Sequence, residues 1–197
     1  MPTLRANPSV YRLKITLVGI EPPIWRCIQV PSTLLLCCLH DAIQAIVGWT
    51  DSHLHQFEKD GKNWGGPEND EFGDLELLDE SKVPVGKLLL VEGDSMVYVY
   101  DFGDNWRHEV VLEKILPLDA AAIQKPVCLA GKRRCPPEDV GGVSGYQEFL
   151  EVIFEPGHEE FGHYREWAGD PVHAEEFNLK AVNDILERMR WPKRHRR

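Results

Sequence analysis

The side chains that could bind a ligand or transfer a proton are concentrated in three short segments, residues 49–55, 101–108 and 135–142. The middle segment carries two carboxylates, an amide, an indole and an imidazole. The last segment places two acids directly after a pair of prolines, and the first has histidines two residues apart. If the fold brings the three segments together, their carboxylates and imidazoles could bind a divalent metal ion or act as acids and bases.

Several residues of these segments are candidates for a binding surface. They are Asp101, Asp104, Asn105, Trp106, His108, Glu138, Asp139, His53 and His55. We expect His53 and His55 to face the same side of a strand, because side chains two residues apart in a strand share a face. The alternative is a purely structural role, since Asp and Asn in turns cap backbone amides and a rigid Pro-Pro-Glu-Asp loop can fix the start of a helix.

The familiar catalytic motifs do not occur in the sequence. It has no phosphate-binding loop, no Gly-x-Ser-x-Gly elbow and no His-Glu-x-x-His pair. Cys128 and Cys135 are separated by six residues, which is longer than the spacing typical of a zinc site. We therefore assign no catalytic residue and no resident cofactor. A divalent metal ion is the one cofactor that the acids and histidines could hold.

The composition is that of an ordinary globular protein, with 43% hydrophobic and 27% charged residues among 197. The net charge is −10, and because the last ten residues hold six Lys or Arg and no acid, the rest has 16 basic against 32 acidic side chains. Such a surface repels nucleic acid, so we expect contact with nucleic acid only through the basic tail, residues 191–197. The alternative for this tail is a solvated chain end.

The sequence also bears on the cellular compartment. No apolar stretch is long enough to span a bilayer, and no secretory signal is visible at the N-terminus. The five cysteines, an odd number, indicate reduced thiols and not a disulfide framework. We therefore expect a cytoplasmic protein without a membrane partner.

Hydrophobic periodicity predicts a single α+β domain, with a mostly antiparallel sheet and helices packed on one face. The expected strands are residues 10–18, 24–30, 53–58, 97–101 and 108–116, and the expected helices are 33–47, 144–154, 158–167 and 178–190. Residues 125–145 are rich in proline and glycine and are expected to be irregular. The core is expected to include Trp25, Trp49, Phe102 and Phe149. The domain is expected to cover residues 8–190, followed by the tail.

The three polar segments also carry a resemblance to a known family. Residues 49–57, 100–108 and 135–142, together with residues 11–15, 23–26 and 177–179, make the chain similar to the plasmid pRiA4b ORF-3-like family over about residues 8–190. This family comprises small bacterial and archaeal proteins from chromosomes, plasmids and mobile elements. The resemblance implies a single α+β domain more than it implies an activity. Some relatives carry a label resembling a transposon resolvase, which the serines of this chain do not support.

Two functional hypotheses follow. The first is a non-catalytic binding or regulatory module, linked to plasmids or mobile elements, whose partner is a protein or a small molecule. The second is a metal-assisted enzyme or accessory factor acting on nucleic acid or phosphoesters. Its candidate metal ligands are Asp101, Asp104, His108, Glu138 and Asp139.

Overall fold

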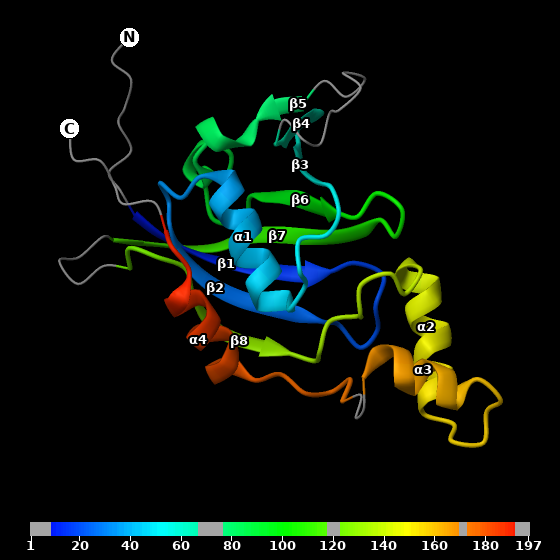
Figure 1. Cartoon of the computed structure of the whole chain (residues 1–197). Helices are drawn as coiled ribbons and strands as arrows, with labels where there is room; N and C mark the ends of the chain where they lie inside the picture. Colours follow the sequence, from blue (N-terminus) through cyan, green and yellow to red (C-terminus); the bar gives the residue numbers. More distant parts are fainter. Residues whose placement is uncertain (1–8, 67–76, 118–122, 170–172, 192–197) are drawn as a thin grey trace, which may run out of the picture.

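The computed structural model describes residues 9–66, 77–117, 123–169 and 173–191 and contains one sheet of eight strands (Figure 1). The strand order is β5-β4-β3-β6-β7-β1-β2-β8, and only β4 and β5 pair in parallel. The strands are β1 Ser9–Leu17, β2 Trp25–Pro31, β3 His55–Lys59, β4 Lys62–Gly65, β5 Leu77–Asp79, β6 Ser95–Tyr100, β7 Trp106–Pro117 and β8 Val127–Lys132.

Helices cover one face and one end of this sheet. They are α1 Leu36–Val47, α2 Gly142–Ile153, α3 Phe161–Ala168 and α4 Leu179–Arg188, with two short 3-10 helices, η2 Glu80–Lys82 and η3 Val85–Lys87. In Figure 1, α1 lies across one face and α4 lies beside it against β8, whereas α2 and α3 pack together at one end of the sheet. The predicted α+β domain with a mostly antiparallel sheet is confirmed.

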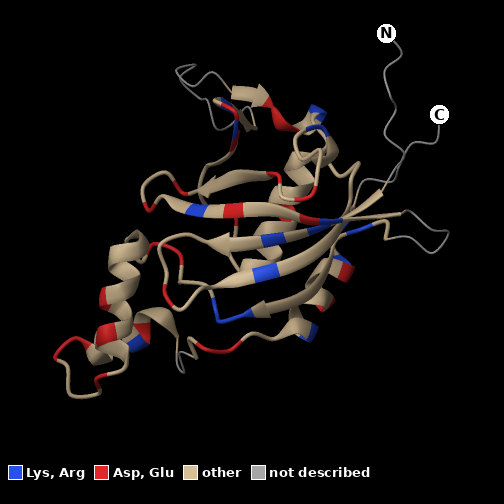
Figure 2. Ribbon diagram, turned by 180° about the vertical axis from the view of Figure 1, so that it is seen from behind, with Lys and Arg blue, Asp and Glu red and all other residues tan. Residues whose placement is uncertain are grey.

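The alternation of residue types in the central strands decides which face is buried. In β1, Leu13, Ile15 and Leu17 are at most 2% exposed and belong to the core between the sheet and α1. Arg12 and Lys14 point to the opposite face, over which Figure 2 shows no helix among the described residues. The period of two in the sequence therefore corresponds to one covered and one open face.

Two of the four expected core residues lie outside the core. Phe102 is 40% exposed at the tip of the turn between β6 and β7. Trp25 is half-buried on the open face of the sheet, with Nζ of Lys14 5.7 Å from its ring centroid. Both residues were expected in the core because they are hydrophobic, although Trp25 stands at an outward position of the alternation in β2. Trp49 and Phe149 are buried, as predicted.

The prediction of irregular structure for residues 125–145 is wrong in two places. The segment contains β8, which pairs with β2 at one edge of the sheet, and α2 already begins at Gly142. The glycine that argued against a strand, Gly131, is required by close packing, since a Cβ there would lie 2.7 Å from the Phe177 ring.

Asn183 of α4 occupies the free edge of β8. Its Oδ1 accepts a hydrogen bond from the backbone N–H of Cys128, and its Nδ2 donates to the carbonyl oxygen of Cys128, both at 2.9 Å. These two bonds replace the missing neighbouring strand for a residue that is only 2% exposed.

We expect Asn183→Ala to lower the free energy of unfolding by about 1.5 kcal/mol, because both polar groups of the buried Cys128 backbone lose their partners. Urea denaturation measures the loss. Asp184→Ala is the control, because Asp184 is on the same helix and its only described partner is the exposed Lys180. An equal effect of both substitutions would contradict this role of Asn183.

The end of the described chain packs back on α4, where Nε1 of Trp191 donates to the carbonyl oxygen of Leu186 at 2.9 Å. Residues 192–197, which make up nearly all of the basic tail, lie outside the described residues. Within the part of the chain that the structure describes, no helix has the length and apolar character needed to cross a membrane.

Candidate functional site

The structure brings the three polar segments together at one end of the sheet. Nε1 of Trp49 donates to the carbonyl oxygen of Pro136 at 2.8 Å, and the Tyr100 hydroxyl donates to Oε1 of Glu138 at 2.6 Å. The rings of Trp49 and Tyr100 stack with centroids 5.0 Å apart. The first and third segments are therefore both held against the end of β6.

Glu138 holds these loops in place. Its Oε2 accepts hydrogen bonds from the backbone N–H and the hydroxyl of Thr50, at 2.9 and 2.6 Å, while its Oε1 accepts from Tyr100. The Tyr100 hydroxyl in turn accepts from the backbone N–H of Ser52 at 2.9 Å. Burial, and then the bond to Glu138, raise the pKa of Tyr100, so the phenol stays protonated and remains a donor. Both oxygens of Glu138 are thus used within the protein.

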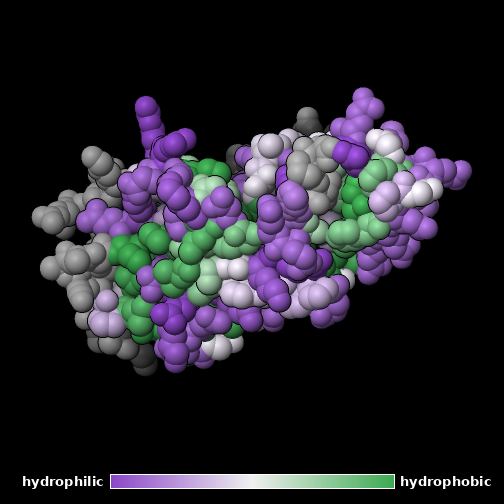
Figure 3. Space-filling view, turned by 90° about the horizontal axis from the view of Figure 1, so that it is seen from below, coloured by the Kyte–Doolittle hydropathy of each residue, from purple (hydrophilic) through white to green (hydrophobic). Residues whose placement is uncertain are grey.

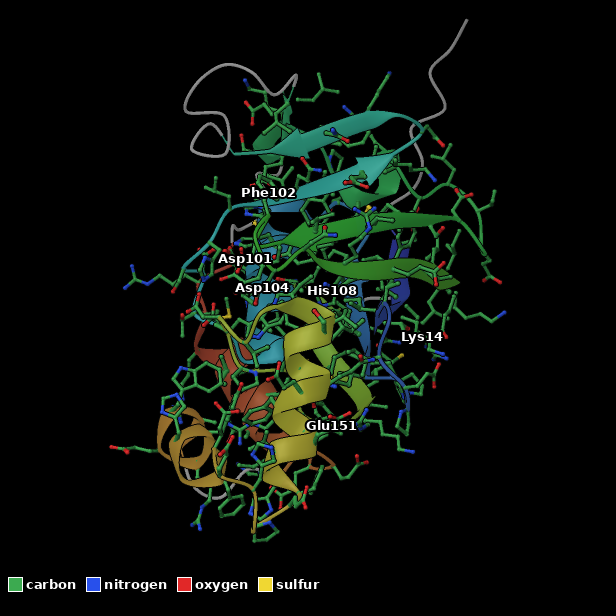
Figure 4. All side chains as sticks on the ribbon, turned by 90° about the vertical axis from the view of Figure 1, so that its right-hand side faces the viewer. Lys14, Asp101, Phe102, Asp104, His108 and Glu151 are labelled. Carbon is green, nitrogen blue, oxygen red and sulfur yellow. The ribbon has the colours of Figure 1, made fainter. Side chains whose placement is uncertain are left out.

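The turn between β6 and β7 is fixed by its own carboxylates. Asp101 and Asn105 adopt positive φ angles of 56° and 53°, and Oδ1 of Asp101 accepts from the backbone N–H of Gly103 at 2.9 Å. Oδ2 of Asp104 accepts from the backbone N–H of Gly141 at 3.1 Å, which joins the turn to the start of α2. Figure 4 shows Asp101, Phe102 and Asp104 grouped beside α2.

His53 lies between the two remaining acids of the site. Its Nδ1 is 3.7 Å from Oδ2 of Asp101, and its Nε2 is 3.2 Å from Oδ1 of Asp139. Nε2 is not aligned for a hydrogen bond with any described group, and the Asp139 side chain is 69% exposed. We call His53, Asp101 and Asp139 the rim. Its ligand atoms lie within 4.8 Å of one another, close enough to hold a cation.

Other candidates do not reach the rim. His53 precedes β3, so it does not share a strand face with His55, which is 4% exposed and bonded to Glu80. The expectation that the two histidines face the same side of a strand is therefore wrong, because β3 begins at His55, two residues later than predicted. Trp106 and His108 are each 1% exposed, inside the core. Of the five candidate metal ligands of the enzyme hypothesis, only Asp101 and Asp139 belong to the same cluster of possible ligand atoms.

A cleft of about 360 Å³ lies between the C-terminal end of α1, residues 134–138 and α4, and Glu138 of its lining directly precedes Asp139 of the rim in the sequence. The hydrogen bonds of Trp49, Tyr100, Asp104 and Glu138 join the three segments, and we call these residues the frame. Trp49 and Glu138 of the frame also line the cleft, as does Pro136, the partner of Trp49. Seen from below, the molecule presents hydrophobic side chains in separate areas with hydrophilic ones between them (Figure 3). The volume suits one or two side chains of a partner or a small molecule.

Comparison with known proteins identifies the family to which the chain belongs. The model of the family described as plasmid pRiA4b ORF-3-like protein matches residues 9–181. The chain belongs to this family. It is 40% identical over 195 residues to the uncharacterized protein y4hQ of Sinorhizobium fredii, covering 96% of this chain and 97% of that protein.

The fold of this pRiA4b ORF-3-like protein also has a counterpart among solved structures. It is similar to the crystal structure of a protein of unknown function, MM3350, from Methanosarcina mazei Go1, with a TM-score of 0.78 and 42% sequence identity. The match covers 88% of this chain and 97% of that one. The resemblance predicted from the sequence is confirmed, together with the single-domain α+β fold.

Sequence reasoning missed three residues on which the site of this pRiA4b ORF-3-like protein depends. Tyr100 and Thr50 donate hydrogen bonds to Glu138, and Nη2 of Arg26 donates to Sγ of Cys135 in the adjoining loop. Tyr100 and Arg26 stood in the segments that carried the family resemblance, and Thr50 lay inside the first polar segment. Their positions in these segments could have indicated that the three residues belong to the site, whereas the sequence did not show which residues they contact.

The turn offers a direct comparison of two aspartates. We expect Asp101→Ala to lower the free energy of unfolding by about 1 kcal/mol, because the oxygen that accepts the Gly103 N–H is lost and alanine disfavours a positive φ. Asp104→Asn should change it by less than about 0.5 kcal/mol, because asparagine keeps an oxygen for the Gly141 N–H. Thermal melts of both variants test this. An Asp101→Ala variant as stable as the natural protein would show that the turn does not depend on the Asp101 carboxylate.

Proposed function

We propose that the protein is a non-catalytic binding module that recognises a basic, partly apolar segment of another protein. The surface would consist of the rim, the exposed Phe102 and the adjoining cleft. Because the family description refers to a plasmid, the proposal includes a role in the biology of plasmids or other mobile elements.

The observation that carries the proposal is uncompensated negative charge beside an exposed aromatic ring. None of the described Lys or Arg side chains forms an ion pair with Asp101, Asp104, Glu138 or Asp139. Phe102 projects from the same turn with 40% of its surface exposed. A lysine or arginine next to a large apolar residue would complement both features.

The hydrogen bonding of the frame supports binding over catalysis. Glu138 and Asp104 are committed to backbone amides and hydroxyls, which makes the loops rigid before a partner arrives and lowers the entropy lost on binding. His108, the candidate imidazole with a pKa lowered to about 4 by burial, is enclosed in the core. A general base must reach the proton that it removes, and this one does not reach the rim.

The test uses a short synthetic peptide in which arginine and leucine alternate, and the same peptide with glutamate in place of arginine. In ¹⁵N NMR titrations we expect the basic peptide to shift amides of residues 49–53, 101–105 and 138–141, and the acidic peptide to leave them unchanged. Phe102→Ser and Asp139→Asn combined should weaken binding about 10-fold.

Glu109→Gln is the matched control, because Glu109 is an exposed acid of β7, outside the rim. It removes the same charge from the protein as Asp139→Asn and should leave the affinity unchanged. The proposal fails if the acidic peptide binds equally well, or if the double variant binds the basic peptide as tightly as the natural protein does.

A further inference from the structure

The cleft beside the frame combines hydrophobic walls with a buried arginine. Its aromatic lining consists of Trp49, Tyr146, Phe149 and Phe177, and aliphatic side chains of α1 and α4 complete the walls. Arg26 also belongs to the lining, although it is only 3% exposed, and its guanidinium carbon lies 4.3 Å from the centroid of the Phe177 ring. A ligand in the cleft would therefore be surrounded mostly by apolar groups and would meet one buried positive charge.

The described residues do not use the full hydrogen-bonding capacity of Arg26. A guanidinium has five N–H hydrogens, and three of those of Arg26 are donated to the main-chain oxygens of Ile46, Trp25 and Lys132. A fourth, on Nη2, is donated to Sγ of Cys135 at 3.4 Å. The second hydrogen of Nη2 has no acceptor among the described residues, and no described carboxylate forms an ion pair with the group. Since buried charges in proteins are usually paired, this guanidinium favours an anion in the cleft that it lines.

Two further features of the lining favour negative charge in the cleft. Arg134 is exposed, and its side chain forms no ion pair with a described carboxylate. The N-terminal end of α4 also borders the cleft, because its N-cap residue Asn178 and Ala181 of its first turn belong to the lining. The main-chain N–H groups at the N-terminus of a helix carry partial positive charge, which adds to the charge of the two arginines.

The two acids of the lining do not cancel this positive charge. Both oxygens of Glu138 accept hydrogen bonds from Thr50 and Tyr100, and these donors stabilise its charge locally. The Glu176 side chain is 72% exposed, so solvent screens its charge. Arg26, by contrast, acts in a buried region of low dielectric constant, where a charge interacts more strongly with a ligand. The inner part of the cleft therefore favours an anionic group.

We propose that the cleft binds a small carboxylic acid with an apolar body, such as an arylacetate. The apolar body packs against the aromatic walls, while the carboxylate accepts the remaining Nη2 hydrogen of Arg26 and is attracted by Arg134. The volume of about 360 Å³ lies in the range of small-molecule sites, which typically combine an apolar lining with a few polar groups. This inference does not depend on the proposed function, because that function places a cation at the rim, whereas the cleft selects an anion.

The test is a titration of the full-length protein with sodium phenylacetate, followed by ¹⁵N NMR in the absence of any peptide. We expect shifts of the amides of residues 45–49, 134–135 and 177–182, which border the cleft, and of the Nε–H signal of Arg26. Phenylacetamide has nearly the same shape but no charge. It should bind at least about 10-fold more weakly, because hydrogen bonds between two ionised groups are stronger than those to a neutral amide.

Arg134 is the arginine to substitute, because the loss of Arg26 would destabilise the fold. Arg134→Gln should weaken phenylacetate binding about 3-fold. Arg188→Gln is the matched control, since Arg188 is an exposed arginine of α4 that does not line the cleft, and it should leave the affinity unchanged. The inference is overturned if phenylacetate at millimolar concentration leaves the cleft amides unshifted, if phenylacetamide binds as tightly as phenylacetate, or if Arg188→Gln weakens binding as much as Arg134→Gln.

Discussion

Arg26→Met is expected to lower the free energy of unfolding by about 3 to 4 kcal/mol. Arg26 is 3% exposed, and its guanidinium donates to the carbonyl oxygens of Ile46, Trp25 and Lys132 at 2.8, 2.9 and 3.0 Å. Three of its partners are thus main-chain oxygens of α1, β2 and β8, a fourth is Sγ of Cys135 at 3.4 Å, and no described carboxylate forms an ion pair with it.

The large effect follows from what the methionine leaves behind. Ile46 belongs to the last turn of α1, where carbonyl oxygens have no partner within the helix and carry partial negative charge. Methionine fills much of the space of the arginine stem but donates no hydrogen bond, so up to three main-chain oxygens lose a donor. The favourable position of the guanidinium over the Phe177 ring, 4.3 Å from its centroid, is lost as well.

Arg107→Met is the control for this experiment. Arg107 pairs with Glu58 at 2.6 Å on the open face of the sheet, and its side chain is 39% exposed. Solvent screens this pair, so the loss should stay below about 1 kcal/mol. Guanidinium chloride unfolding measures both variants. If Arg26→Met loses no more than Arg107→Met, the three main-chain contacts of Arg26 do not stabilise the fold as we infer.

Acidification should destabilise the protein through His108. Burial lowers the pKa of this imidazole to about 4, against about 6.5 for an unperturbed histidine. The unfolded chain therefore binds a proton at pH values where the folded protein does not, and stability falls as the pH drops from about 6.5 toward 4. Between pH 7 and pH 4.5 the expected loss from His108 alone is about 2.5 kcal/mol.

His108→Phe separates this contribution from those of other titrating groups. Neither ring nitrogen of His108 has a well-aligned hydrogen-bond partner, and the ring packs edge-on against Trp49 with centroids 5.5 Å apart. Phenylalanine should therefore leave stability at pH 7 unchanged or slightly higher, because it has no polar atom to desolvate. Urea unfolding at pH 7 and pH 4.5 should show a smaller acid loss in the variant, by about 2.5 kcal/mol. An equal acid loss in both proteins would contradict the assignment to His108.

The sequence predicted the central part of the sheet well. Clean alternation in residues 10–18, and again around the turn at 101–105, marks strands with one buried face, and the structure has β1, β6 and β7 there. Such patterns are local, because a period of two follows from the geometry of a single strand. The polar segments could be singled out for the same reason: turns need particular residues at particular positions.

Other features depended on partners that are distant in the sequence. Gly131 favoured irregular structure in the sequence, but the structure shows that the Phe177 ring lies where a Cβ at this position would be. Phe102 was expected inside because it is hydrophobic, yet the turn that Asp101 closes directs it to solvent. In both cases the residue type favours one conformation or degree of burial, and contacts with other parts of the chain determine the one that is adopted.

The same division holds for the candidate site. By itself, the sequence determined which three segments carry the acids and histidines and that the chain folds as one α+β domain. Only the tertiary structure decided that Glu138 is used to hold the loops, that His53 faces Asp101 and Asp139, and that His55 stacks on His40. The physical reason is that residue type fixes which bonds a side chain can make, whereas the identity of its partner depends on which distant segments the fold brings within a few ångströms.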